Sequence, residues 1–217
     1  MRPDAPVLAF DTSAAHCAAA LLCGDRVVAQ WVEEMATGQA ERLMPMLEEV
    51  LAGAGLTWRD LGAIGVGVGP GNFTGVRISV AAARGLALSL GIPAIGVTRL
   101  EALAEGLPRP LAVVEDARRG EAYIQSFGAD PVAAPRLMRL DEAAGPLSGL
   151  ALTGSAASSV AAMTGGAVLD PAMPLAEATA RIAARRADEP APRPAPLYLR
   201  AADAAPPSDP PPRLIDA

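Results

Sequence analysis

Residues 63–97, AIGVGVGPGNFTGVRISVAAARGLALSLGIPAIGV, contain a strand, a helix and a second strand. The apolar run at 63–68 predicts a buried strand, and the Ala-rich run from about residue 74 to residue 90 predicts a helix. A glycine followed by a proline at 91–93 ends that helix, because proline cannot continue it. The apolar residues at 94–97 predict the next strand. Alternating strands and helices of this kind indicate an α/β layered domain.

The residues before this stretch predict the rest of the same lobe, which we place at residues 1–107. Residues 7–11 form an apolar strand that ends in Asp11, and two further apolar runs at 17–23 and 26–33 complete a strand meander. Apolar residues at helical spacing between Thr37 and Ala54 predict the first helix.

The second half of the chain partly repeats the first. Residues 111–127 form a strand that ends in acidic residues, a turn and a second strand, which is the order seen at residues 7–22. We therefore expect a second, related lobe at 108–200, and its Ala-, Gly- and Pro-rich composition indicates that it is abbreviated. The Pro-rich residues 201–217 predict a disordered tail.

The composition excludes several kinds of site. The 18 basic residues are all arginine, so no lysine can form a Schiff base or serve a phosphate-binding P-loop. One histidine, His16, and two cysteines cannot complete a zinc site. The net charge of -6 and the sequence pI of about 4.9 are unlike an RNA-binding surface, so direct tRNA binding by this chain alone is not expected. Without a signal peptide or a membrane span, we expect a cytoplasmic protein.

The two predicted helices of the first lobe carry more apolar surface than one small core requires. The apolar arc of the helix at 37–54 is wider than the stripe of about 100° that one core contact needs. The helix at 74–90 is nearly apolar all round, with small residues along one face. The surplus surface could be covered by a partner subunit or by the second lobe, and the pattern alone does not choose between them. The residues that we expect at a partner interface are Leu43, Met44, Leu47, Leu51, Gly75, Ser79, Ala82, Ala83 and Leu86.

The glycine-rich loop at 69–72 also has two interpretations. A turn between a strand and a helix can bind phosphate through free backbone N–H groups, and Asp11 could then hold a metal ion or a water. However, the loop matches neither common phosphate-binding motif. The P-loop (Walker A) motif requires a lysine, which the chain lacks, and the Gly-x-Gly-x-x-Gly motif requires a glycine where this chain has Asn72. The proline–glycine pair and a capping Asn72 favour a structural turn. The possible vestigial phosphate or nucleotide loop comprises Asp11, Gly69, Gly71 and Asn72.

Six segments, in order, resemble the bacterial TsaB (YeaZ-like) family over about residues 7–200. They are LAFDTS, ERLMPMLEEVL, the long run from GVGPGNFTGVR to TRLEALA, DARRGEAY, LTGS and PLYLR. The central run is highly specific, and DARRGEAY and PLYLR add moderate weight. The resemblance implies an actin/sugar-kinase/Hsp70-like (ASKHA) α/β fold with two related lobes, the second reduced.

The resemblance also implies a role without catalysis. TsaB-like proteins dimerise with and activate a TsaD-like threonylcarbamoyltransferase, which works with a TsaE-like ATPase to form threonylcarbamoyladenosine beside the tRNA anticodon. They pair with TsaD, or with themselves when alone, through the helices that match residues 37–54 and 74–90. The metal-binding helix histidines of the catalytic relative have no counterpart around Gln39–Leu43. We therefore assign no catalytic or metal-binding residue to this chain, and ATP and a metal ion to its partner subunits.

An alternative is a stand-alone ATP-dependent enzyme of the same fold, a kinase or a carbamoyltransferase that uses Asp11 and the glycine-rich loop. The short second lobe disfavours it, because nucleotide sits between two full lobes in this fold. A peptidase has less support still, since His16 is the only possible base. If the pairing role holds, Gly75→Leu is expected to abolish pairing while the chain stays folded.

Overall fold

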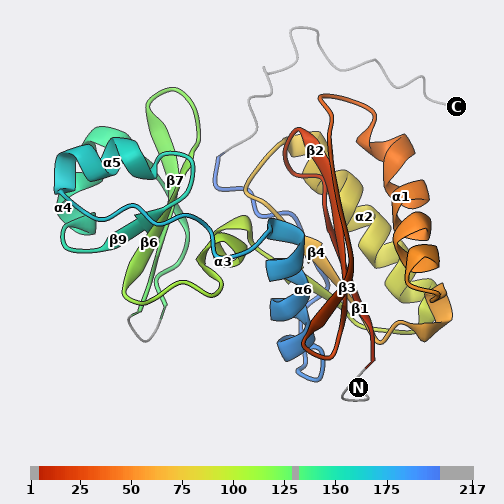
Figure 1. The fold of residues 1–217 in the computed structure, drawn as a ribbon. Helices are drawn as coiled ribbons and strands as arrows, with labels where there is room; N and C mark the ends of the chain where they lie inside the picture. Colours follow the sequence, from red (N-terminus) through yellow and green to blue (C-terminus); the bar gives the residue numbers. More distant parts are fainter. Residues whose placement is uncertain (1–4, 129–131, 201–217) are drawn as a thin grey trace, which may run out of the picture.

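The computed structural model describes residues 5–128 and 132–200, which form two α/β lobes (Figure 1). The first lobe contains a five-stranded sheet in the order β3-β2-β1-β4-β5. Its strands are β1 (Val7–Asp11), β2 (His16–Cys23), β3 (Arg26–Glu34), β4 (Ala63–Gly67) and β5 (Ala94–Val97). The first three strands are antiparallel, whereas β4 and β5 run parallel to β1. The predicted meander and the two later strands are confirmed.

Two helices cover one face of this sheet and a third covers the other. Helices α1 (Gln39–Gly53) and α2 (Phe73–Leu90) pack side by side against the strands, with the one-turn helix η1 (Trp58–Asp60) following α1. Their inward residues form the main core together with Leu8, Phe10 and Leu21. Both helices begin and end within two residues of the bounds that the sequence predicts.

The second lobe repeats the first in reduced form. Its four-stranded sheet has the order β8-β7-β6-β9, in which β6 is antiparallel to β7 and parallel to β9. The same relation holds for β1 with β2 and β4 in the first lobe. The elements are β6 (Leu111–Asp116), β7 (Glu121–Phe127), β8 (Arg136–Arg139), η2 (Leu140–Glu142), α4 (Ala144–Leu147), β9 (Ala151–Thr153) and α5 (Ala157–Thr164). The expected ASKHA-type pair of related lobes, with the second reduced, is therefore the fold of this chain.

Helix α6 (Leu175–Arg186) belongs by sequence to the range expected for the second lobe, 108–200, but lies on the first lobe. Although it follows the second lobe in sequence, it packs on the first sheet, on the face opposite α1 and α2. It approaches closely because the contact is made by alanines and by Gly65, where an added Cβ would lie 2.9 Å from Cβ of Ala183. The short helix α3 (Arg99–Ala104) lies between α6 and β6.

The C-terminal segment returns to both lobes. The backbone N–H of Leu197 donates to the carbonyl of Val68, 2.8 Å away, and the Leu197 side chain packs against the core of the first lobe. Arg200 forms an ion pair with Glu121 on β7 and donates to the carbonyl of Ala117. Residues 197–200 thus connect the two lobes. The predicted tail at 201–217 lies outside the described residues.

Helix α2 is the one helix in the described ranges that is long and apolar enough, by length and composition alone, to cross a membrane. In this structure Val76, Val80 and Ala83 on one side of α2 pack into the core of the first lobe. That packing is typical of a helix that covers a sheet in a layered α/β domain.

Candidate functional site

The glycine-rich loop lies against the turn between β1 and β2. The backbone N–H of Asn72 donates to the carbonyl of Ser13 at 2.6 Å, and Oγ1 of Thr12 donates to the carbonyl of Gly75 at 2.7 Å. A Cβ at Gly71 would overlap the Ser13 carbonyl, and one at Gly75 would overlap the Thr12 carbonyl. These glycines are therefore required for the close approach of two backbone segments.

The start of α2 is capped by a residue of the loop itself. Oδ1 of Asn72 accepts the backbone N–H of Gly75 at 2.9 Å, as a helix-capping residue does. Gly69 has a φ of 88°, a conformation that favours glycine, and its carbonyl accepts the N–H of Arg99 at 2.8 Å. The Ser13 carbonyl and the Asn72 side chain thus already accept the N–H groups of Asn72 and Gly75. These contacts favour a structural turn, so we derive no chemistry from the loop, and a phosphate or nucleotide role for Asp11, Gly69, Gly71 and Asn72 stays a prediction.

Asp11 lies at the end of β1 and is almost completely buried. Its Oδ1 accepts hydrogen bonds from the Ser13 backbone N–H at 2.9 Å, Oγ of Ser13 at 2.8 Å and Nε2 of His16 at 2.9 Å. Its Oδ2 points towards Gly67, where any side chain would overlap it. Burial raises the pKa of this carboxyl, but the hydrogen bond and charge of His16 and the two Ser13 bonds outweigh burial and lower the pKa below its usual value. The geometry is that of a charged turn-stabilising residue.

We expect Asp11→Asn to reduce the free energy of unfolding by about 2 kcal/mol at pH 7, because the hydrogen bonds to a charged carboxylate become weaker bonds to a neutral amide oxygen. Since the folded pKa is lowered, this contribution is present above the unfolded pKa, near 3.9, and disappears as the pH falls through the folded value. Urea unfolding of both proteins between pH 7 and pH 2 measures it. A difference between them that stays constant down to pH 2 would contradict a charged Asp11.

The structure corrects most of the expected interface residues. Leu43, Leu47 and Leu51 on α1 are buried in the chain's own core. The same is true of Gly75, Ser79 and Ala83 on α2, while Ala82 and Leu86 are partly buried against this core. The six buried residues face the sheet and the neighbouring helix and cannot contact a partner in this conformation, whereas Ala82 and Leu86 keep part of their surface accessible. Of the nine, Met44 is the one classed as exposed, with 37% of its surface accessible.

A different set of residues from the same two helices faces outward. We call this set the α1–α2 surface. It consists of Ala40, Glu41, Met44, Pro45, Glu48 and Ala52 on α1 and Arg77, Ala81, Arg84, Gly85 and Leu88 on α2. Leu88 is 82% exposed, which is unusual for a leucine. In the sequence, each of the two helices has two rows of apolar or small residues. Only the position of the sheet shows which row is buried in the core and which row forms this surface.

The hairpin turn between β6 and β7 holds the segment DARRGEAY. Arg118 and Arg119 have φ values of 63° and 56°, a left-handed conformation that is uncommon for arginine. Nearby, Glu115 forms an ion pair with Arg99 and accepts the backbone N–H of Ser155. These contacts join α3 and the start of α5 to the hairpin, so they position the two lobes. Within residues 5–128 and 132–200, no group of three or more His, Cys, Asp or Glu side chains could hold a metal ion.

Comparisons with known proteins agree with this architecture. The sequence profile of the family described as "TsaD: tRNA N6-adenosine threonylcarbamoyltransferase" matches residues 33–148, more than half of the chain. The chain is 37% identical over 209 residues to an uncharacterized protein of Mycobacterium tuberculosis, a match that covers 92% of this chain and 94% of that protein. It is 38% identical over 130 residues to the tRNA threonylcarbamoyladenosine biosynthesis protein TsaB of Escherichia coli, covering 57% of this chain. That match spans only 55% of the E. coli protein, about half its length.

Solved structures give the same result. The crystal structure of YeaZ from Pseudomonas aeruginosa superposes with a TM-score of 0.70 at 28% identity, over 90% of this chain and all of that chain. A component of an (R)-2-hydroxyglutaryl-CoA dehydratase from Acidaminococcus fermentans shares the fold, with a TM-score of 0.56 at 12% identity. The two related lobes place the chain among α/β proteins with the ASKHA fold. Within that class, the chain belongs to the TsaB (YeaZ-like) family.

Proposed function

We propose that this chain is a non-catalytic subunit that dimerises with a TsaD-like threonylcarbamoyltransferase and activates it in the formation of threonylcarbamoyladenosine beside the tRNA anticodon. The observation that carries the proposal is the α1–α2 surface. Two adjacent helices that already cover the sheet expose Met44, Ala81, Gly85 and Leu88 to solvent. Small and apolar residues on neighbouring helices allow the close packing of a partner's helices.

The chain's own chemistry gives little support to the alternative of a stand-alone enzyme. Asp11 is bound to Ser13 and His16, and the glycine-rich loop is filled by the turn at Thr12 and Ser13. Under the proposal, ATP and the metal ion belong to the TsaD-like and TsaE-like partner subunits. When the TsaD-like subunit is missing, the same surface pairs two copies of this chain. The tRNA is bound by the complex in the cytoplasm rather than by this acidic chain alone or at a membrane.

Reconstitution tests the proposal directly. The TsaD-like and TsaE-like proteins of the same genome are incubated with tRNA, ATP and threonylcarbamoyl-adenylate, with and without this chain, and the modified adenosine is quantified by mass spectrometry. We expect product only when the chain is present, and a complex with the TsaD-like subunit on size-exclusion chromatography. Equal product without the chain would overturn the proposal. Micromolar ATP binding with turnover by the isolated chain, measured by calorimetry and phosphate release, would favour the stand-alone enzyme.

A further inference from the structure

The two helices of the α1–α2 surface carry opposite charges on their outward sides. Helix α2 contains Arg77 and Arg84 and no acidic residue, although the chain as a whole has a net charge of -6. Helix α1 instead exposes Glu41 and Glu48. Because like charges repel and opposite charges attract across an interface, this distribution specifies which charges a partner must present.

Arg77 is held in place before any partner binds. Its guanidinium carbon lies 3.6 Å from the ring centroid of Phe73, and its Nε donates to the hydroxyl of Tyr198 at 2.9 Å. Phe73 and Tyr198 are themselves in contact, with ring centroids 5.1 Å apart. A cation fixed in this way loses little side-chain entropy on binding an anion. Arg84, by contrast, forms no ion pair within the part of the chain that the structure describes.

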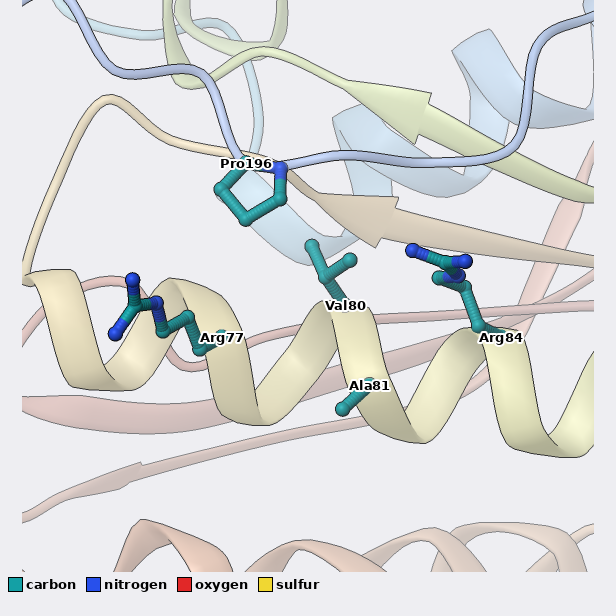
Figure 2. A pocket seen from close by; sticks show the side chains of 5 residues that line it. All are labelled: Arg77, Val80, Ala81, Arg84 and Pro196. Carbon is teal, nitrogen blue, oxygen red and sulfur yellow. The ribbon is translucent and has the colours of Figure 1, made fainter. Parts of the chain in front are cut away.

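A cavity of about 370 Å³ separates the two arginines (Figure 2). Val80 and Ala81 on α2 and Pro196 on the C-terminal segment line it, together with Arg77 and Arg84. Figure 2 shows Val80 directed towards Pro196, with the arginines on either side along the helix. The cavity therefore has an apolar middle and a positive charge at each end.

This hollow continues along α2. A second cavity of about 440 Å³ shares Arg84 and is lined by Leu88, Ile92 and Pro194 among others. The two cavities adjoin each other beside the exposed Leu88 and are open to solvent, so together they form a groove along the helix. A site for a small anion would instead be a closed pocket. A groove with this length and apolar content is suited to a helix of another protein.

We propose that the groove between α2 and residues 193–198 receives an acidic amphipathic helix of the TsaD-like subunit. Arg77 and Arg84 are seven residues apart, which is about 10 Å along a helix. A partner helix that runs alongside presents residues i and i+7 on one face at the same spacing. Carboxylates at those positions meet the two arginines, and an apolar side chain between them enters the cavity at Val80. The inference rests on the proposed function and adds the chemistry of the partner segment.

The test uses Arg84→Glu, because Arg77 also holds Tyr198 and its loss would disturb the fold locally. Arg136→Glu on β8 is the matched control, since it changes the net charge equally at an exposed position of the second lobe. Affinity for the full-length TsaD-like subunit is measured by isothermal titration calorimetry at 50 and 500 mM NaCl. We expect Arg84→Glu to weaken binding at least tenfold at low salt and Arg136→Glu by less than twofold. High salt should reduce wild-type affinity more than that of Arg84→Glu.

The possible outcomes are distinguishable. Wild-type pairing that Arg84→Glu and salt leave unchanged overturns the acidic-helix inference while the proposed function stands. If the wild-type chain does not bind the TsaD-like subunit, both the proposed function and the inference are wrong. If Arg84→Glu disrupts self-association in sedimentation velocity but not binding to the TsaD-like subunit, the groove receives a second copy of this chain and the inference is wrong.

Discussion

Gly75→Ala is expected to lower the free energy of unfolding by about 3 kcal/mol or more. A Cβ at this position would overlap the carbonyl oxygen of Thr12, which is part of the buried turn after β1. Backbone cannot move aside as a flexible side chain can, so the turn or the start of α2 must shift. Overpacking in a filled core usually costs about 1–3 kcal/mol, and a backbone clash lies at the upper end of that range. Urea unfolding followed by circular dichroism measures the change.

Gly85→Ala on the same helix is the matched control. No atom lies within 4 Å of a Cβ at Gly85, and the residue is exposed. Alanine has a higher helix propensity than glycine, so this variant should be more stable by about 0.5–1 kcal/mol. Equal effects of the two substitutions would show that the Thr12 contact is not tight. The sequence-based expectation that Gly75→Leu blocks pairing in a folded chain is wrong for the same reason, because leucine would disrupt the fold first.

Ala81→Trp is expected to weaken pairing with the TsaD-like subunit about 100-fold, or about 3 kcal/mol of binding free energy. Ala81 points outward at the centre of the exposed row on α2 and lines the cavity beside Arg77 and Arg84. An indole there fills the space that a partner helix needs for close approach. Calorimetry with the purified TsaD-like subunit measures the affinity, and the yield of modified adenosine in the reconstituted reaction should fall with it.

Ala162→Trp on α5 serves as the control, since Ala162 is an exposed helical alanine of the second lobe. Both variants should unfold within about 0.5 kcal/mol of the wild type, as surface substitutions usually do. If a folded Ala81→Trp variant binds the TsaD-like subunit as tightly as the wild type does, α2 is not part of the interface. An equal loss of pairing in both variants would point to the second lobe instead.

The local sequence was sufficient for the strands and long helices of the first sheet and insufficient for several later elements. The glycine–proline ends and apolar runs of the first lobe predicted β1–β5, α1 and α2 closely, because these elements have strong periodicity and clear stop signals. The sequence analysis did not predict β8, α4 or α6. The edge strand β8 has only four residues, and α6 packs mainly through alanines, whose small side chains give a weak hydrophobic pattern.

The candidate site was predicted at the level of helices but not of residues. The sequence indicated that α1 and α2 have more apolar surface than one core needs, and both do cover the sheet while exposing Met44 and Leu88. It then selected the wrong rows, since Leu47 lies in the core and Ser79 is buried. A helix with small or apolar residues on two faces does not reveal which face meets the sheet.

The sequence by itself determined the α/β class and the glycine-dependent turn after β4, because both rest on short-range spacing of particular residue types, and the resemblance of six of its segments indicated the family and the ASKHA fold. Only the tertiary structure decided that Gly71 and Gly75 accommodate the close approach of the turn at Thr12 and Ser13. It also decided which sides of α1 and α2 face outward. These properties depend on contacts between residues some sixty positions apart, and such contacts exist only after the strands have aligned the segments in space.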